Sequence, residues 1–233
     1  MALLEVCCGN LESVDAAVAG GARRIELCAD LELDGLTPPM AWLRAVKGRY
    51  PDLTVHVLIR PRDGDFVYSS EEADLVALQT EAALVFGADG IVLGGLTDEG
   101  DVDLELMGQL VSLVDSFNPA HRASITFHRA FDVCRQPFEA LEQLIGLGCD
   151  RILTSGQEAT ALEGSDMLRE LHRRACGRIG ILPGGGVTPA NAARILSLTG
   201  CSEIHASASV SIDGKKVTDP ELVSGILKEI QAL

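Results

Sequence analysis

Short apolar runs with β-strand character alternate with longer stretches of helical periodicity along the whole chain. Eight runs are predicted as strands: Leu3–Cys8, Arg24–Cys28, Thr54–Arg60, Asp89–Leu93, Ala123–His128, Arg151–Thr154, Arg178–Leu182 and Glu203–Ser207. Helices are predicted at Leu11–Ala19, Pro39–Gly48, Glu71–Phe86, Asp103–Asp115, Phe138–Leu147, Ala161–Ala175, Pro189–Leu198 and Pro220–Ala232. Strands that alternate with helices indicate parallel strands joined by helical crossovers.

Eight near-equal units without a linker favour one α/β domain, a (β/α)8 barrel of the TIM type that spans residues 1–233. The alternative is an open doubly wound sheet. Glycines at 20–21, 87, 148 and 200 agree with this division, since they stand where helices should end. Thr188 is predicted to cap the seventh helix, with Pro189 in its first turn.

Polar side chains occupy one face of several predicted strands, whereas buried parallel strands are usually apolar on both faces. Side chains alternate along a strand, so the polar face must point into the barrel while the apolar face packs against the helices. The inward polar set is Glu5 and Cys7, Glu26 and Cys28, His56 and Arg60, Ser124, Thr126 and His128, and His205 and Ser207. We expect most of these groups to meet at the carboxyl ends of the strands, where such barrels place their catalytic residues.

These inward charges need partners, because burying one unpaired charge costs several kcal/mol. They must therefore pair with one another, bind a ligand, or do both. One interpretation is an ion-paired network that only sets the strand register. The other is a catalytic site in which Glu5, Glu26 and His128 exchange protons with a substrate.

Loops that follow the predicted strands carry residues suited to an anionic ligand. Arg60 and Arg62 could grip an anion in bidentate fashion near Asp65, or could instead bridge loop carboxylates such as Asp63. The other positions predicted to bind the ligand are Arg129, Asp132, Thr154, Ser155, Gly184, Gly185, Gly186, His205 and Ser207. Consecutive glycines let backbone N–H groups approach an oxyanion, and barrels often bind phosphate after strands seven and eight. A flexible glycine turn and a His128 satisfied by the backbone are the alternatives.

Two cysteines occupy matching positions on neighbouring predicted strands, Cys7 on the first and Cys28 on the second. Adjacent strands lie about 5 Å apart, so both thiols could reach one soft ion, and two thiolates suit Cu(I). Two small buried cysteines that merely line the interior are the alternative. Cys8 faces the helices by the same alternation, and the chain has no CxxC pair to indicate a structural zinc site.

Charge and composition exclude several classes of protein. The net charge of −15 argues against nucleic acid as a partner, because phosphate backbones attract basic surfaces. We expect no membrane span, since no apolar run reaches ~18 residues, and no signal peptide before the first strand. Seven cysteines without a disulfide pattern suit a reducing, cytoplasmic setting. The four lysines lie away from strand ends, which disfavours a Schiff-base aldolase.

Short motifs near the predicted strand ends follow one another in order along the chain. They are Glu5-Val6-Cys7, Arg24-Ile25-Glu26-Leu27-Cys28, Gly35-Leu36-Thr37-Pro38, Arg60-Pro61-Arg62, Gly64-Asp65-Phe66, Phe127-His128-Arg129-Ala130-Phe131-Asp132, Leu153-Thr154-Ser155-Gly156 and Pro183-Gly184-Gly185-Gly186. Together they resemble the CutC family over essentially the whole chain. The resemblance implies a TIM-type barrel, a cytoplasmic homo-oligomer (dimer or tetramer) and a role in copper homeostasis, with Cu(I) held by Cys7 and Cys28. The chain departs from the family pattern at Cys8-Gly9-Asn10 and at Asp63, away from the inward face.

Two functions compete on these observations. A copper-binding protein explains Cys7 and Cys28 but not Arg60, Arg62 or the glycine loop, because a cation gains nothing from guanidinium groups. The alternative is an enzyme of isomerase, lyase or hydrolase type that acts on a small anionic or phosphorylated metabolite, with Arg60 and the glycine backbone holding the anion. A scaffold that binds no ligand is the third interpretation.

Overall fold

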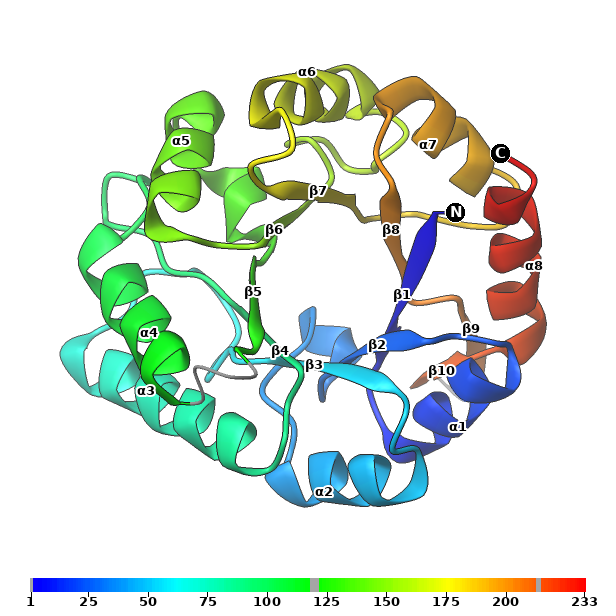
Figure 1. Cartoon of the computed structure of the whole chain (residues 1–233), viewed down its shortest axis with the longest axis horizontal. Coiled ribbons are helices and arrows are strands. Elements are labelled where there is room, and N and C mark those ends of the chain that lie inside the picture. Colours follow the sequence, from blue (N-terminus) through cyan, green and yellow to red (C-terminus); the bar gives the residue numbers. More distant parts are fainter. Residues whose placement is uncertain (1, 118–121, 213–214) are drawn as a thin grey trace.

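Eight parallel strands form the inner wall of a barrel, and the helices between them form its outer layer (Figure 1). This computed structural model describes residues 2–117, 122–212 and 215–233. The strands are β1 (Leu3–Cys8), β2 (Arg24–Leu27), β3 (Thr54–Leu58), β4 (Gly90–Leu93), β5 (Ser124–Phe127), β6 (Arg151–Thr154), β7 (Gly180–Pro183) and β8 (Glu203–Ala206). Their hydrogen-bonded order is β7-β6-β5-β4-β3-β2-β1-β8, and β8 returns beside β7. The predicted (β/α)8 barrel is confirmed, and the open doubly wound sheet is wrong.

The outer layer follows the predicted helices, with two corrections at their starts. The helices are α1 (Leu11–Ala19), α2 (Met40–Arg49), α3 (Ser70–Val85), α4 (Leu104–Phe117), α5 (Pro137–Leu147), α6 (Ser165–Ala175), α7 (Ala192–Thr199) and α8 (Pro220–Gln231). Thr188 does not cap α7, because its own N–H donates to the Asn191 side chain and the helix starts only after that turn. The start of α6 shifts because the Ala161 N–H donates to the Gly185 carbonyl, which holds this segment as a loop.

Short elements that the sequence pattern did not predict follow three of the strands. They are the 3-10 helices η1 (Leu31–Leu33) and η2 (Arg129–Val133) and the antiparallel hairpin of β9 (Ser209–Ile212) and β10 (Lys215–Thr218). Because η1, η2 and the hairpin come after β2, β5 and β8, they lie at the carboxyl ends of the strands. They therefore contribute to any site at that end.

The strand register brings polar side chains to common heights inside the barrel. Glu5 of β1 lies opposite Arg24 of β2 and His205 of β8, and Cys7 lies opposite Glu26. The alternate positions along these strands are apolar and completely buried. Each large apolar side chain buried in this way stabilises the fold by roughly 1.5–3 kcal/mol, so the two-faced pattern fixes which face points inward.

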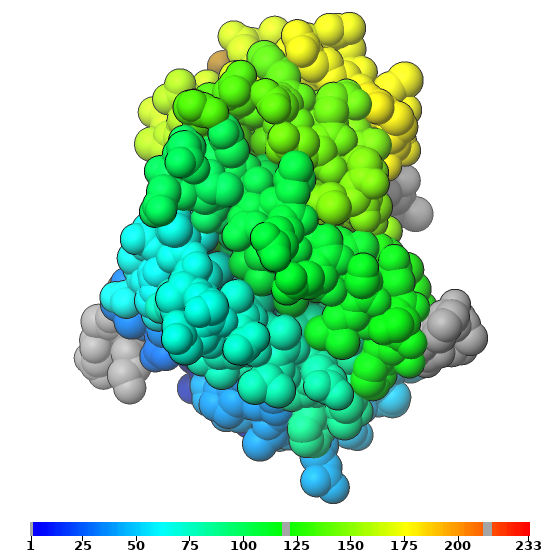
Figure 2. Space-filling view, turned by 90° about the vertical axis from the view of Figure 1, so that its left-hand side faces the viewer, coloured from blue at the N-terminus to red at the C-terminus, as the bar shows by residue number. Residues whose placement is uncertain are grey.

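The outer surface carries exposed apolar side chains on α3 and α4, the side of the molecule that Figure 2 shows. Leu78 and Val85 of α3 are each 63% exposed, and Leu104 and Phe117 of α4 are also exposed. Within residues 2–117, 122–212 and 215–233, no helix is both long and apolar enough to cross a membrane.

Candidate functional site

A cavity of about 370 Å³ opens at the carboxyl ends of the strands, and we call it the mouth cavity. Most of its polar lining comes from Cys7, Glu26, Arg60, His128, Arg129 and His205. These residues lie on or directly after β1, β2, β3, β5 and β8, so the barrel gathers them from distant parts of the chain. The mouth cavity therefore lies where the strand alternation predicted a site.

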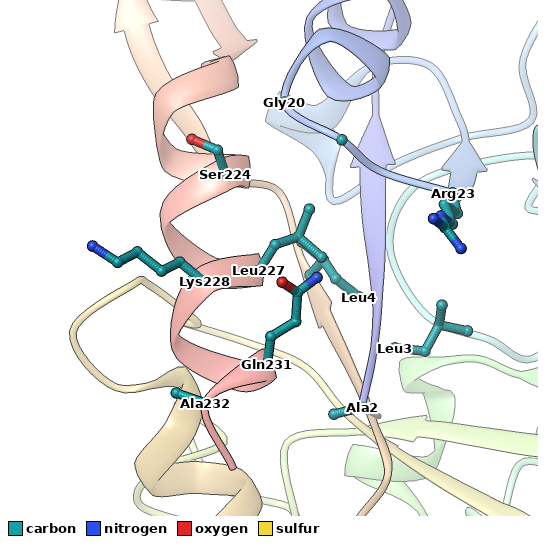
Figure 3. Close-up of a pocket in the computed structure, with 11 residues that line it drawn as sticks. Ala2, Leu3, Leu4, Gly20, Arg23, Ser224, Leu227, Lys228, Gln231 and Ala232 are labelled. Carbon is teal, nitrogen blue, oxygen red and sulfur yellow. The ribbon is translucent and has the colours of Figure 1, made fainter.

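A larger hollow of about 770 Å³ lies at the opposite end of the barrel, between α8 and the start of β1 (Figure 3). Its wall includes Leu3, Leu4 and Leu227, and its two basic residues are Arg23 and Lys228. Among the described residues that line it there is no carboxylate, histidine or cysteine. Because the groups predicted to transfer protons or bind a metal line the mouth cavity instead, the mouth cavity is the candidate site.

Glu5 lies below the mouth cavity in a completely buried ionic cluster. Its carboxylate oxygens are 2.8 Å from Arg24 Nε, 2.9 Å from His56 Nδ1 and 2.9 Å from His205 Nδ1. Burial alone would raise the pKa of Glu5, but the contacts with His205, His56 and Arg24 hold it well below its ordinary value. Glu5 is therefore a fixed carboxylate that orients its partners. These contacts support a positioning role, and the catalytic role of Glu5 stays a prediction.

Arg24 links this cluster to a second carboxylate and was missing from the predicted site. Its Nη2 donates to Glu203 Oε2 at 2.5 Å, and Arg151 Nε donates to the same oxygen at 2.8 Å. The ion-paired network considered from the sequence is thus present, but it occupies the layer beneath the cavity. Arg24 shares the inward face with Glu26, two residues further on, which is the signal that could have revealed it.

Cys7 and Cys28 lie side by side as free thiols, with 3.5 Å between their sulfur atoms. The contact with Cys28 and burial together raise the pKa of Cys7 well above its ordinary value. The contact with Cys7 lowers the pKa of Cys28, but burial and the charge of Glu26 outweigh it, so the net shift is upward. Cys8 points to the other side, where its thiol donates to the Val6 carbonyl, as the alternation predicted.

Glu26 and His205 stand beside Cys7 in the mouth cavity. His205 Nδ1 is 2.9 Å from Glu5 Oε1, and its Nε2 is 3.7 Å from Glu26 Oε2. Burial raises the pKa of Glu26 despite the opposing charge of His205. Burial would lower the pKa of His205, but contacts with Cys7 and Glu5 raise it well above its ordinary value. One ligand atom each from Cys7, Glu26 and His205 lie within 4.8 Å of one another, close enough to share a metal ion.

His128 lines the mouth cavity with one hydrogen-bond donor, and its role as an acid or base stays a prediction. Its Nδ1 accepts the Ala130 N–H at 3.2 Å, which leaves the ring proton on Nε2. Burial, with the nearby charge of Arg60, lowers the pKa of His128 to about 3. Nε2 has no partner among the described residues, and the ring packs against Phe66 at 4.9 Å between centroids. His128 therefore offers one N–H to whatever occupies the cavity.

Arg60 is buried and uses most of its donors on loop carbonyls. Its Nη1 donates to Leu33 and Gly35 at 2.9 and 3.1 Å, and its Nη2 donates to Gly64 at 2.9 Å. The guanidinium lies over the Phe66 ring, 5.1 Å from its centroid. Nε is buried without a partner in the described part of the chain. Arg60 thus fixes the loops after β2 and β3 and keeps one N–H for a ligand.

Arg62 and Asp65 are not among the described residues that line the mouth cavity, so their predicted contact with a ligand is not supported. Arg62 Nε donates to Glu72 at 2.6 Å, and its Nη2 donates to Asp65 at 2.8 Å. β3 has already ended at Leu58, so strand alternation no longer controls the direction of Arg62. Arg62 therefore bridges the carboxylates of Glu72 and Asp65, which is the alternative role that the sequence left open.

Asp132 organises the loops that follow β5 and β6. It accepts the Thr154 hydroxyl at 2.5 Å and the Ser155 N–H at 2.9 Å, and it pairs with Arg129 Nε at 2.8 Å. Thr154 and Ser155 are completely buried and support the loops through these contacts, and their contact with a ligand stays a prediction. Arg129 and Asp132 do line the mouth cavity.

A second cavity, of about 390 Å³, lies between the loops after β7 and β8, and we call it the β7–β8 cavity. Gly185, Gly186 and Ser207 line it, whereas a side chain at Gly184 would collide with Leu153. The residues that line both cavities are Cys7, Arg129, His205 and Lys216. Lys216 lies on the unpredicted hairpin, and no sequence pattern marked it as a site residue.

The fold and the site together define a (β/α)8 barrel whose mouth holds two adjacent buried thiols beside a histidine and a glutamate. The model of the CutC family matches residues 2–210, and the chain belongs to this family. It is 46% identical over 206 residues to a family protein CutC of Chromobacterium violaceum, which covers 88% of this chain and 81% of that protein. It is 44% identical to the copper homeostasis protein cutC homolog of Mus musculus over 224 residues. The matched part is 96% of this chain and 80% of the mouse protein. The putative copper homeostasis protein CutC from Streptococcus agalactiae has a solved structure that matches with a TM-score of 0.83 at 31% identity, over 89% of this chain and 99% of that one.

Proposed function

We propose that this protein binds Cu(I) between Cys7 and Cys28 and acts in copper homeostasis. The observation that carries the proposal is the 3.5 Å separation of two buried thiols on neighbouring strands. Thiolates are soft ligands that select Cu(I) over harder cations. The name of the mouse relative, a copper homeostasis protein, agrees with this role.

The groups around the two thiols fit Cu(I) as bound cargo. Both cysteine pKa values are raised, so Cu(I) must displace protons to bind. One ligand atom of His205 lies within 4.8 Å of those of Cys7 and Glu26, but Cys28 is not part of that group. We therefore propose the two thiols alone as the ligands of Cu(I), because two thiolates suit this ion.

Competition with the Cu(I) chelator bathocuproine disulfonate tests the proposal. The variant that combines Cys7→Ser with Cys28→Ser should lose about a hundredfold or more in affinity, because even the loss of a supporting contact costs 10–100-fold. Cys8→Ser is the matched control, since Cys8 is equally buried but donates to Val6 on the helix side. A double variant that competes as well as wild type would refute this copper site.

A second function is favoured by two buried donors on residues that line the mouth cavity, His128 and Arg60. Binding of Cu(I) gives these donors no role. His128 Nε2 and Arg60 Nε have no partner among the described residues, and both suit an anion or a carbonyl oxygen. We propose that the cavity also binds a small organic anion and transforms it, with Glu26 moving the proton. The raised pKa of Glu26 brings this carboxyl closer to the neutral range in which a general acid works.

A thermal-shift screen with small carboxylates and phosphorylated metabolites tests the second function. A true ligand at 100-fold excess over its Kd should stabilise the protein by ~2.7 kcal/mol. His128→Phe should remove this shift, while Glu26→Gln should abolish turnover and keep the shift. If no anion raises the melting midpoint, this second function is wrong.

We also propose that the chain acts as a single domain in the cytoplasm and forms a homo-oligomer. All seven cysteines are free thiols, which suits a reducing compartment. The exposed apolar side chains Leu78 and Val85 on α3 would be covered by a second copy of the chain.

A further inference from the structure

The β7–β8 cavity has a positive lining in a strongly acidic protein. The chain has 34 acidic and 19 basic side chains, yet Arg129, Lys216 and His205 line this cavity and none of the described residues that line it is a carboxylate. A concave surface lined by one sign of charge concentrates ligands of the opposite sign. The cavity therefore offers basic groups to an anion, of which Arg129 and His205 also contact the carboxylates of Asp132, Glu5 and Glu26 behind the lining.

Two glycines leave the backbone open on one side of the cavity. Gly185 and Gly186 have φ of +101° and +68°, values that non-glycine residues rarely adopt. Because neither residue has a side chain, a ligand can approach the backbone closely there. A Cβ atom at Gly185 would lie 3.8 Å from Arg129 Cζ, so this backbone and the guanidinium are neighbours.

The end of β8 adds hydroxyl donors to the same cavity. Ser209 Oγ donates to Ser207 Oγ at 3.1 Å, which leaves the Ser207 hydroxyl proton available to a ligand. Donors thus come from Arg129 and Ser207, beside the open glycine backbone. A phosphoryl group carries three acceptor oxygens and close to two negative charges at neutral pH, so it can accept from both.

The adjoining mouth cavity supplies independent evidence for a bound ligand. Arg60 and His128 are only 6% and 3% exposed, and Nε of the first and Nε2 of the second have no partner in the described part of the chain. A buried polar group without a partner is costly, and a ligand that reaches it removes the cost. The two cavities adjoin, because they share Cys7, Arg129, His205 and Lys216.

We propose that the β7–β8 cavity binds the phosphoryl group of a small phosphomonoester whose remainder enters the mouth cavity. This inference deepens the second function proposed above and rests on it for the non-phosphoryl end of the ligand. It gives the substrate class as phosphorylated metabolites with a carbonyl or carboxylate group that His128 and Arg60 can bind.

Isothermal titration with inorganic phosphate, 3-phosphoglycerate and glycerate tests the inference. We expect 3-phosphoglycerate to bind at least about tenfold more tightly than either fragment, because it uses both sets of donors. Ser207→Asp places a negative charge in the β7–β8 cavity and should abolish binding of phosphate and of 3-phosphoglycerate. Ser202→Asp is the matched control, since it makes the same change on the exposed residue just before β8, at the other end of the barrel.

A second pair of variants tests the same inference if Ser207→Asp folds poorly. Lys216→Gln should weaken phosphate binding, and Lys228→Gln, which removes an exposed charge on α8, should not. Phosphate binding that survives both Ser207→Asp and Lys216→Gln would overturn the inference. Binding of 3-phosphoglycerate that is sensitive to His128→Phe but not to Ser207→Asp would also overturn it and would leave the second function standing. If phosphate binds as tightly as 3-phosphoglycerate, the phosphoryl subsite is supported. The second function is then contradicted, because the rest of the ligand adds no affinity.

Discussion

Removing the charge of Glu5 tests whether the buried cluster holds the site together. Glu5→Gln keeps the shape of the side chain but leaves Arg24, His56 and His205 without their shared carboxylate. Glu5 is completely buried, and its three partners lie at 2.8–2.9 Å. Breaking a buried ion pair costs about 3–5 kcal/mol, because the remaining charge is left uncompensated. Arg24 still has Glu203 at 2.5 Å, so we expect a loss of about 3 kcal/mol, the lower end of this range.

Urea and thermal unfolding at pH 7 would measure this loss. A change of 1 kcal/mol shifts the midpoint of a chain of this size by about 2–4 °C, so the variant should melt roughly 6–12 °C lower. Asp15→Asn is the control, since Asp15 pairs with Arg49 on the surface, where both side chains are about half exposed and solvent screens the pair. Its effect should be far smaller.

The pH dependence of the difference gives a second check on the same reasoning. The pKa of Glu5 is lowered in the folded state, so its contribution is complete above its unfolded value near 4.5 and is lost as the pH falls through the folded pKa. Between pH 7 and about 5 the gap between wild type and Glu5→Gln should widen as histidine becomes protonated in the unfolded chain, because Glu5 helps to raise the pKa of His205 above its ordinary value of 6.5. Below pH 4.5 the gap should narrow as Glu5 itself becomes protonated. If Glu5→Gln is as stable as Asp15→Asn at pH 7, the cluster does not stabilise the barrel and this account of it is wrong.

Four other outcomes are expected. Nitrogen-15 NMR should show His128 neutral with its proton on Nε2 throughout pH 5–8, because its pKa is lowered to about 3 and its Nδ1 accepts the Ala130 N–H. Imidazolium signals at pH 5 would contradict the lowered pKa, and a proton on Nδ1 would contradict the tautomer. Cu(I) affinity should rise from pH 6 to pH 8 because the pKa values of Cys7 and Cys28 are raised, and a flat profile in chelator competition would argue against thiolate ligands. Arg62→Ala should leave the affinities for Cu(I) and phosphate unchanged, since Arg62 binds Glu72 and Asp65. A lower affinity for either ligand would show that Arg62 belongs to the site. Leu78→Glu with Val85→Glu should shift sedimentation towards a monomer, and an unaffected oligomer would exclude this face of α3 as the interface.

The sequence alone determined the barrel and the inward face of β1, β2, β3, β5 and β8, because alternation along a strand is a local property. Cys7 and Cys28 were predicted as neighbours from their matching places on consecutive strands, and their sulfur atoms lie 3.5 Å apart. Parallel pairing of consecutive strands needs only the register, and the burial of one apolar face specifies that register. The same reasoning placed Glu26 and His205 at the carboxyl ends of the strands.

Only the tertiary structure decided how deep each polar group lies and which partners it has. Glu5 and Glu26 look equivalent in the sequence, yet Glu5 lies in the layer that holds Arg24 and His56, while Glu26 faces the cavity. His128 is a donor because its Nδ1 accepts the Ala130 N–H in the following turn, which leaves the ring proton on Nε2. Such contacts join side chains to loops and strands far away in the chain, and no periodic pattern carries that information. A side chain's direction follows from its own strand, whereas its charge and hydrogen bonds depend on every element that packs around it.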